Sequence, residues 1–108
     1  MRIIISALVK KFPPEEKYDL TSQIRRSSRS VCASIGEAYR KRLYPAHFIS
    51  KVSDADMENS ETQVWLDFAF FCAYIDEKRR IELETKSIEV GKLLYHMMAN
   101  PEKYNNNK

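Results

Sequence analysis

The spacing of helix-breaking residues constrains the fold of this chain more than any other feature. Its 108 residues include only two glycines and four prolines, and the prolines stand at positions 13, 14, 45 and 101. Because proline ends or kinks a helix, this spacing leaves long uninterrupted stretches that favour an all-α chain. A chain of this length is expected to form one domain, residues 1–108, which buries a core without disulfide or metal cross-links.

Apolar spacing and the prolines together predict four helices, joined by short turns, over about residues 3–12, 15–43, 45–75 and 77–99. Three consecutive isoleucines in the first segment would also suit a strand, but Ile4, Leu8 and Phe12 keep helical spacing. Even a first helix of twelve residues would span only about 18 Å, against roughly 33 to 45 Å for the others. We therefore predict an antiparallel up-and-down four-helix bundle with a short first helix, whose missing length lies in a longer gene product or is replaced by a partner.

Each long helix carries an apolar stripe that is predicted to face the core. Asn59 and Thr62 fall on the second stripe, where buried polar residues usually fix the register of neighbouring helices by hydrogen bonds. The three stripes are Ile24, Ser28, Val31, Ile35 and Tyr39; then Phe48, Val52, Ala55, Asn59, Thr62, Leu66, Ala69 and Ala73; and finally Ile81, Ile88, Gly91, Leu94, Tyr95 and Met98.

Basic residues gather in one stretch, LTSQIRRSSRSVCASIGEAYRKR, which spans residues 20–42. It holds six cations and one acid, Glu37, whereas the whole chain has a formal net charge of +3. The positive charge is therefore local, and a local patch points to a partner more than a uniform excess does. Helical spacing places several of these cations opposite the core stripe, and the six are Arg25, Arg26, Arg29, Arg40, Lys41 and Arg42.

Three interpretations of these cations remain open on sequence grounds. They can form a solvated face that contributes mainly to solubility. They can pair with an acidic stripe of a neighbouring subunit, formed by Asp54, Glu58 and Glu61. They can instead bind the phosphates of RNA or DNA, in which case an oligomer would repeat the patch and strengthen its field.

The segment VWLDFAFFCAYI, residues 64–75, contains a single charge and is apolar on every side. A helix of this kind must be covered all round, which a small bundle can hardly achieve alone. We therefore predict a homo-oligomer, while a deeply buried helix end in a monomer remains the alternative. The predicted interface residues are Trp65, Phe68, Phe71 and Ile75.

Patterns that support catalysis or cofactor binding are absent from the sequence. Neither His47 nor His96 belongs to a Glu-x-x-His pair, and the calcium-like run DADMENSE lacks the required glycine. Cys32 and Cys72 are forty residues apart without a CxxC motif, so we predict buried, reduced thiols in a cytoplasmic protein. The sequence thus predicts no enzyme activity, no cofactor, no metal site and no membrane segment.

Three segments together resemble a known family: KKFPPEEKYDLTSQIRRSSRSVCASIGEAYRKR, SETQVWLDFAFFCAYI and VGKLLYHMMANPEKY. They are similar to the bacterial four-helix-bundle proteins first noticed in open reading frames within intervening sequences of 23S ribosomal RNA genes. The resemblance covers residues 10–104, with departures from the family pattern at Ser34, Gly36 and Ala38. It implies antiparallel four-helix bundles that assemble into rings, typically pentamers.

A related accessory protein of diversity-generating retroelements forms a basic ring that binds nucleic acid and a reverse transcriptase. The resemblance therefore implies RNA or DNA, and by analogy a reverse transcriptase, as partners. Together with the residue patterns, it leads us to expect a non-enzymatic, homo-oligomeric bundle that binds nucleic acid. The alternative is a protein-interaction scaffold whose basic face pairs with a neighbouring subunit.

Overall fold

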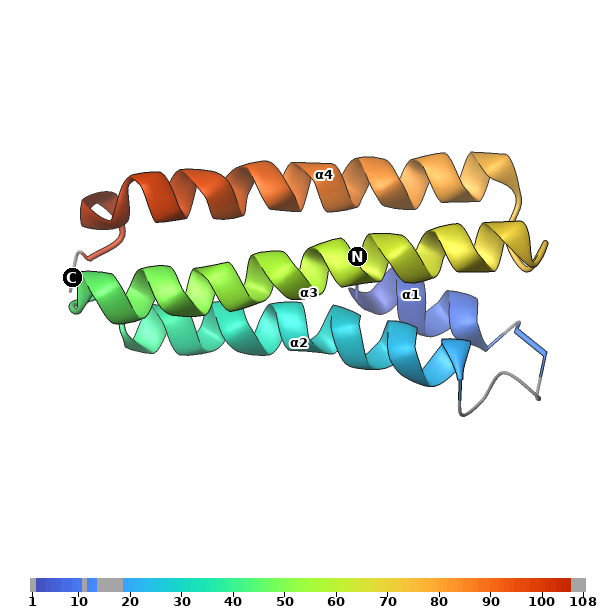
Figure 1. Cartoon of the computed structure of the whole chain (residues 1–108), viewed down its shortest axis with the longest axis horizontal. Helices are drawn as coiled ribbons and strands as arrows, with labels where there is room; N and C mark the ends of the chain where they lie inside the picture. The colour runs from blue at the N-terminus through green and yellow to red at the C-terminus, as the bar shows by residue number, and fades with distance from the viewer. Residues whose placement is uncertain (1, 11, 14–18, 106–108) are drawn as a thin grey trace.

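The computed structural model describes residues 2–10, 12–13 and 19–105. These residues form an all-α fold with no strand among them, as predicted. The helices are α1 (Arg2–Val9), α2 (Leu20–Arg40), α3 (Pro45–Phe71) and α4 (Glu77–Ala99), followed by a short 3-10 helix, η2 (Pro101–Lys103). Consecutive helices run antiparallel, and α3 lies between α2 and α4, while the short α1 lies against α2 (Figure 1). The predicted bundle with a short first helix is confirmed.

The helix boundaries follow from local sequence. Pro45 is the first residue of α3, as predicted, because a missing N–H costs nothing at that position. Helix α3 ends at Phe71, earlier than predicted, because Ala73 has a positive φ of 63°. The Tyr74 N–H then donates to the Ala69 carbonyl at 2.9 Å and closes the helix end. The predicted start of the second helix at residue 15 lies outside the described residues.

The core consists of two apolar clusters, one toward each end of the bundle. The first joins α1 to the start of α2, the end of α3 and the start of α4, and its centre includes Ile5, Ile24, Leu66 and Leu83. The second joins the end of α2 to the start of α3 and the end of α4, and its buried members are Ala38, Phe48, Val52, Ala55 and Leu94. Helix α1 therefore contributes to one cluster only.

Tyr104, which follows η2, covers the second cluster. Its ring stacks on Phe48 with centroids 5.9 Å apart, and its hydroxyl lies 2.7 Å from Nδ1 of His96. Tyr104 therefore packs on the core at the end of the bundle that α1 does not reach.

Buried polar side chains hold the helices in register between the two clusters. Asn59 Nδ2 donates to the Ser87 carbonyl and Ser87 Oγ donates to Asn59 Oδ1, each at 2.9 Å, across α3 and α4. Thr62 Oγ1 donates to Ser27 Oγ at 2.9 Å across α2 and α3. These contacts agree with the predicted role of Asn59 and Thr62, since buried polar groups without partners would be costly.

The predicted stripes are confirmed for α3 and partly wrong for the other helices. All predicted α3 positions are buried except Ala73, which lies in the turn after the helix. In α2, Tyr39 is exposed and Ala38 is buried in its place. In α4, the exposed residues Ile81, Ile88 and Tyr95 were wrongly predicted to face the core, which instead receives Leu83, Ser87 and Leu94.

The prediction of two buried cysteines is wrong, since Cys32 and Cys72 are both exposed free thiols. Cys32 lies seven residues after Arg25 and therefore on the same side of α2 as that arginine. Cys72 directly follows the last residue of α3. None of the described helices combines the length and the apolar character needed to cross a membrane.

Candidate nucleic-acid interface

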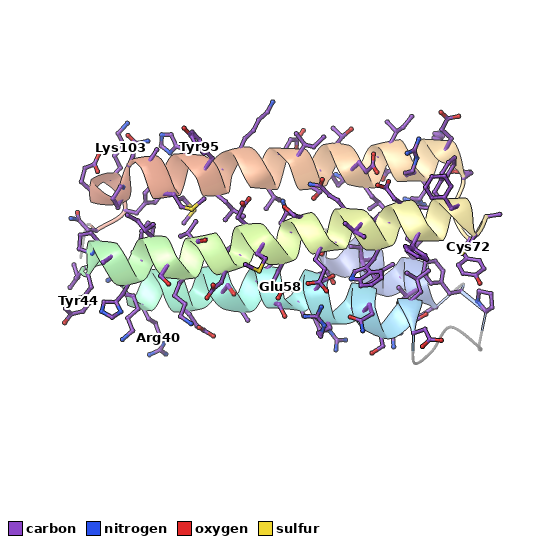
Figure 2. All side chains as sticks on the ribbon, viewed as in Figure 1. Arg40, Tyr44, Glu58, Cys72, Tyr95 and Lys103 are labelled. Atoms are coloured by element: carbon purple, nitrogen blue, oxygen red, sulfur yellow. The ribbon has the colours of Figure 1, made fainter. Side chains whose placement is uncertain are left out.

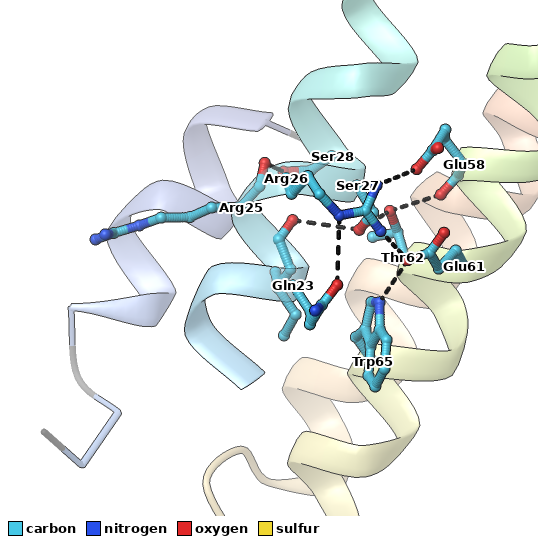
Figure 3. Close-up of polar contacts among 10 residues, drawn as sticks. Gln23, Arg25, Arg26, Ser27, Ser28, Glu58, Glu61, Thr62 and Trp65 are labelled. Carbon is cyan, nitrogen blue, oxygen red and sulfur yellow. Dashed lines mark hydrogen bonds and ion pairs between the residues drawn. The ribbon is translucent and has the colours of Figure 1, made fainter. Parts of the chain in front are cut away.

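Arg26 differs from the other predicted cations because it faces α3 of the same chain. Its NH1 group lies 3.3 Å from Glu58 Oε2, its NH2 group is paired with Glu61 Oε1, and its Nε donates to Gln23 Oε1 at 3.3 Å. Trp65 Nε1 also donates to Glu61 Oε1, at 3.2 Å (Figure 3). Arg26 therefore joins α2 to α3 within the chain, and we do not count it among the cations of the binding face defined below.

The third carboxylate of the predicted acidic stripe, Asp54, also has a partner within the chain. Lys51 Nζ lies 2.8 Å from Glu37 Oε2 and 3.8 Å from Asp54 Oδ2. The hydrogen bond and the charge of Glu37 raise the pKa of the Lys51 ammonium. The sequence predicted that an acidic stripe pairs with a neighbouring subunit. In the structure each of its carboxylates contacts a cation of its own chain, and these residues are Asp54, Glu58 and Glu61.

Four of the predicted cations have no ion-pair partner among the described residues. Arg25 is half-buried and points away from Glu58 and Glu61 (Figure 3), whereas Arg29, Arg40 and Lys41 are exposed. Arg25, Arg29 and Arg40 lie within a sector of about 60° on α2, at roughly 100° per residue, and extend along about 22 Å of the helix. With Lys41, the C-cap residue directly after α2, these three arginines make up what we call the basic face.

Arg42 lies in the turn after α2 and contacts an aromatic ring. Its guanidinium carbon is 4.1 Å from the centroid of Tyr39, and its NH1 donates to the Tyr39 carbonyl at 3.0 Å. The Tyr44 ring stands edge-on to His47, with centroids 6.2 Å apart. These exposed tyrosines were missed from the sequence because Tyr39 was assigned to the core. The available signal was the run of three cations between the two tyrosines in Tyr-Arg-Lys-Arg-Leu-Tyr.

The predicted interface residues divide into exposed and buried members. Phe68 and Phe71 are 55% and 83% exposed on the chain surface. Trp65 is half-buried and packs against the first core cluster. Ile75 is only 7% exposed and lies inside that cluster, so it stabilises the chain's own fold and its prediction as a contact to another subunit needs correction.

A pair of carboxyl groups links α3 to α4. A hydrogen bond to Asp67, partial burial and the charge of Asp67 raise the pKa of Glu84, and Arg80 opposes this shift. The Arg80 guanidinium lies 3.7 Å from Asp67 Oδ1 and covers the Phe70 ring at 4.2 Å from its centroid. Within the described part of the chain, no three His, Cys, Asp or Glu side chains are grouped closely enough to hold a metal ion.

These features define an antiparallel helical-bundle protein with a basic face on one helix and exposed aromatic residues on the next. The family model described as "23S rRNA-intervening sequence protein" matches residues 1–96, and the chain belongs to this family. The chain is also similar to a crystal structure described as a protein with unknown function from the S23 ribosomal protein family of Bacteroides thetaiotaomicron VPI-5482. The two are 32% identical and superpose with a TM-score of 0.81 over 90% of each chain. No curated protein matches this chain.

Proposed function

We propose that this protein is a non-enzymatic, homo-oligomeric helical bundle that binds RNA or DNA through the basic face of α2. The observation that carries the proposal is the absence of an ion-pair partner, among the described residues, for any of the four cations of that face. Cations that form no ion pair within the chain can contact phosphates, and binding to nucleic acid then releases the counterions that surround it. The similar crystal structure is assigned to a ribosomal protein family, which is consistent with such a partner.

The distribution of acids argues against the alternative of a pure interaction scaffold. That alternative needs Asp54, Glu58 and Glu61 of a neighbouring copy to pair with the basic face. In this chain Arg26 contacts Glu58 and Glu61, and Lys51 contacts Glu37 and Asp54. These contacts already neutralise part of the charge of the three carboxylates, so the gain from pairing with a second subunit would be small.

Self-association is proposed to use Phe68 and Phe71 of α3. Both aromatic side chains are more than half exposed, and Val64, one turn before Phe68, is 53% exposed. Aromatic residues on a surface are typical of the centre of protein interfaces. An oligomer would repeat the basic face once per subunit and increase the attraction for a phosphate backbone.

A salt-dependent binding titration tests the proposal. Wild-type protein should bind both a structured RNA and duplex DNA, and its affinity should fall steeply with salt. Four phosphate contacts per subunit give an expected log–log slope of about −3.6 on duplex DNA. The absence of any binding at low salt, where contacts to phosphate are strongest, would refute the proposal.

A further inference from the structure

The turn between α2 and α3 contains cations and aromatic residues that are close together in the sequence. Residues 39–47 contain Arg40, Lys41 and Arg42 but no carboxylate. The Arg42 N–H donates to the Tyr39 carbonyl at 3.2 Å, and the Tyr44 N–H donates to the Lys41 carbonyl at 2.9 Å. These consecutive bonds keep the connection tight, so Arg40 and Tyr44 project from the same end of the bundle (Figure 2).

The two tyrosines of this turn do not contribute to the core. Tyr39 is 61% exposed and Tyr44 is 59% exposed, and neither belongs to a buried cluster. Tyr95 is more exposed still, at 71%, so what distinguishes Tyr39 and Tyr44 is that they flank three consecutive cations. Arg42 covers part of Tyr39 and His47 touches Tyr44 edge-on, which helps to hold both rings in place.

We propose that this turn binds unpaired nucleotides, whose bases stack on Tyr39 and Tyr44 while their phosphates contact Arg40 and Lys41. The inference rests on the proposed function, because it names the form of nucleic acid that part of the same basic face prefers. In a duplex the faces of the bases are already stacked on one another, and only unpaired bases can offer a free face to a tyrosine. Stacking tolerates any base, so no sequence preference is expected.

The distance between the turn and the other cations of the basic face can be spanned by a short single strand. The turn follows Arg29 by about 16 Å along α2, so a strand held at the tyrosines can continue toward Arg29 and Arg25. A duplex would reach the cations through its phosphates alone. The basic face should therefore bind both forms, and the tyrosines should favour the single strand.

The test compares single strands and duplexes in fluorescence anisotropy titrations at one salt concentration. The probes are labelled single-stranded RNA and DNA of about 12 nucleotides, a length within the usual range for such sites, and the matching duplex DNA. Replacing both rings, Tyr39→Leu with Tyr44→Leu, should weaken single-strand binding roughly 5-fold to 150-fold per ring. Duplex affinity and the salt dependence should stay unchanged, because the cations remain.

Two control variants separate stacking from other effects. Tyr39→Phe with Tyr44→Phe keeps both rings and should retain single-strand binding. Tyr95→Leu removes an exposed tyrosine from α4, which does not contact α2 in the described part of the chain, and should also bind like wild type. Circular dichroism should show equal helical content in all variants.

The possible results distinguish this inference from the proposed function. If wild-type protein binds but the leucine variant keeps its single-strand affinity, stacking at the turn is refuted and the basic face stands. An equal loss for single strand and duplex would also refute stacking. If wild-type protein binds neither form at low salt, both the inference and the proposed function fail.

Discussion

Replacement of Arg26 tests whether this residue stabilises the fold, as its contacts with α3 indicate, or contributes to nucleic-acid binding. The Arg26→Gln variant loses the charge that faces Glu58 and Glu61 on α3, but it keeps most of the side-chain stem. The two carboxylates are then left side by side without a cation. We expect a less stable fold with an unchanged affinity for nucleic acid.

The magnitude follows from the exposure of the three side chains. Arg26 is 47% exposed, Glu58 is 23% exposed and Glu61 is 31% exposed, so solvent screens both pairs in part. Pairs of this kind contribute about 0.2 to 1 kcal/mol each, and the two together about 1 kcal/mol. For a domain of this size that loss should lower the melting temperature by about 5 °C.

Thermal unfolding followed by circular dichroism measures this effect, with all variants at one protein concentration because association shifts the midpoint. Arg29→Gln is the matched control, since Arg29 has no ion-pair partner among the described residues, and its midpoint should not change. A double-mutant cycle with Glu58→Gln should give a favourable coupling energy. An unchanged midpoint for Arg26→Gln, together with weaker nucleic-acid binding, would refute the assignment.

Three further changes test other parts of the structure. Ala73→Gly should stabilise the fold by about 0.5 to 1 kcal/mol in denaturant unfolding, because the positive φ of 63° favours glycine; destabilisation would contradict this. The raised pKa of Glu84 means that its protonated form stabilises the fold and that this stabilisation is lost as the pH rises through the raised value. Glu84→Gln should therefore raise the melting temperature at about pH 7 more than at about pH 4, and an equal effect at both would count against the carboxyl pair. Phe71→Glu should reduce the mass measured by light scattering toward 12.7 kDa, whereas Ile88→Glu on α4 should not; a wild-type mass of 12.7 kDa would rule out self-association.

The sequence predicted the helices well where one local rule decided the outcome. Pro45 set the start of α3, and the spacing of Phe48, Val52 and Leu66 identified its buried side. These predictions depend only on the helical period of about 3.6 residues and on the missing N–H of proline. The end of α3 was placed too late because nothing in the residue type of Ala73 predicts a positive φ.

Predictions that depended on a neighbouring helix were less accurate. In α4 the apolar residues Ile81 and Ile88 suggested one side, but polar Ser87 faces the core because Asn59 of α3 bonds to it. Arg26 lies about 100° further round α2 than Arg25, and it reaches Glu58 of α3 while its side chain remains 47% exposed. A single helix pattern carries no information about such partners.

The most direct test of the central claim compares the salt dependence of duplex DNA binding in two double variants with equal charge loss. Arg25→Gln with Arg29→Gln removes two cations of the basic face, while Lys78→Gln with Lys92→Gln removes two exposed cations of α4. If the basic face contacts phosphate, the first variant should flatten the log–log slope by about 1.8, at about 0.9 per lost contact, and the second should leave it near the wild-type value. Equal slopes for both double variants, or a lower mass in light scattering for the first variant alone, would contradict the claim.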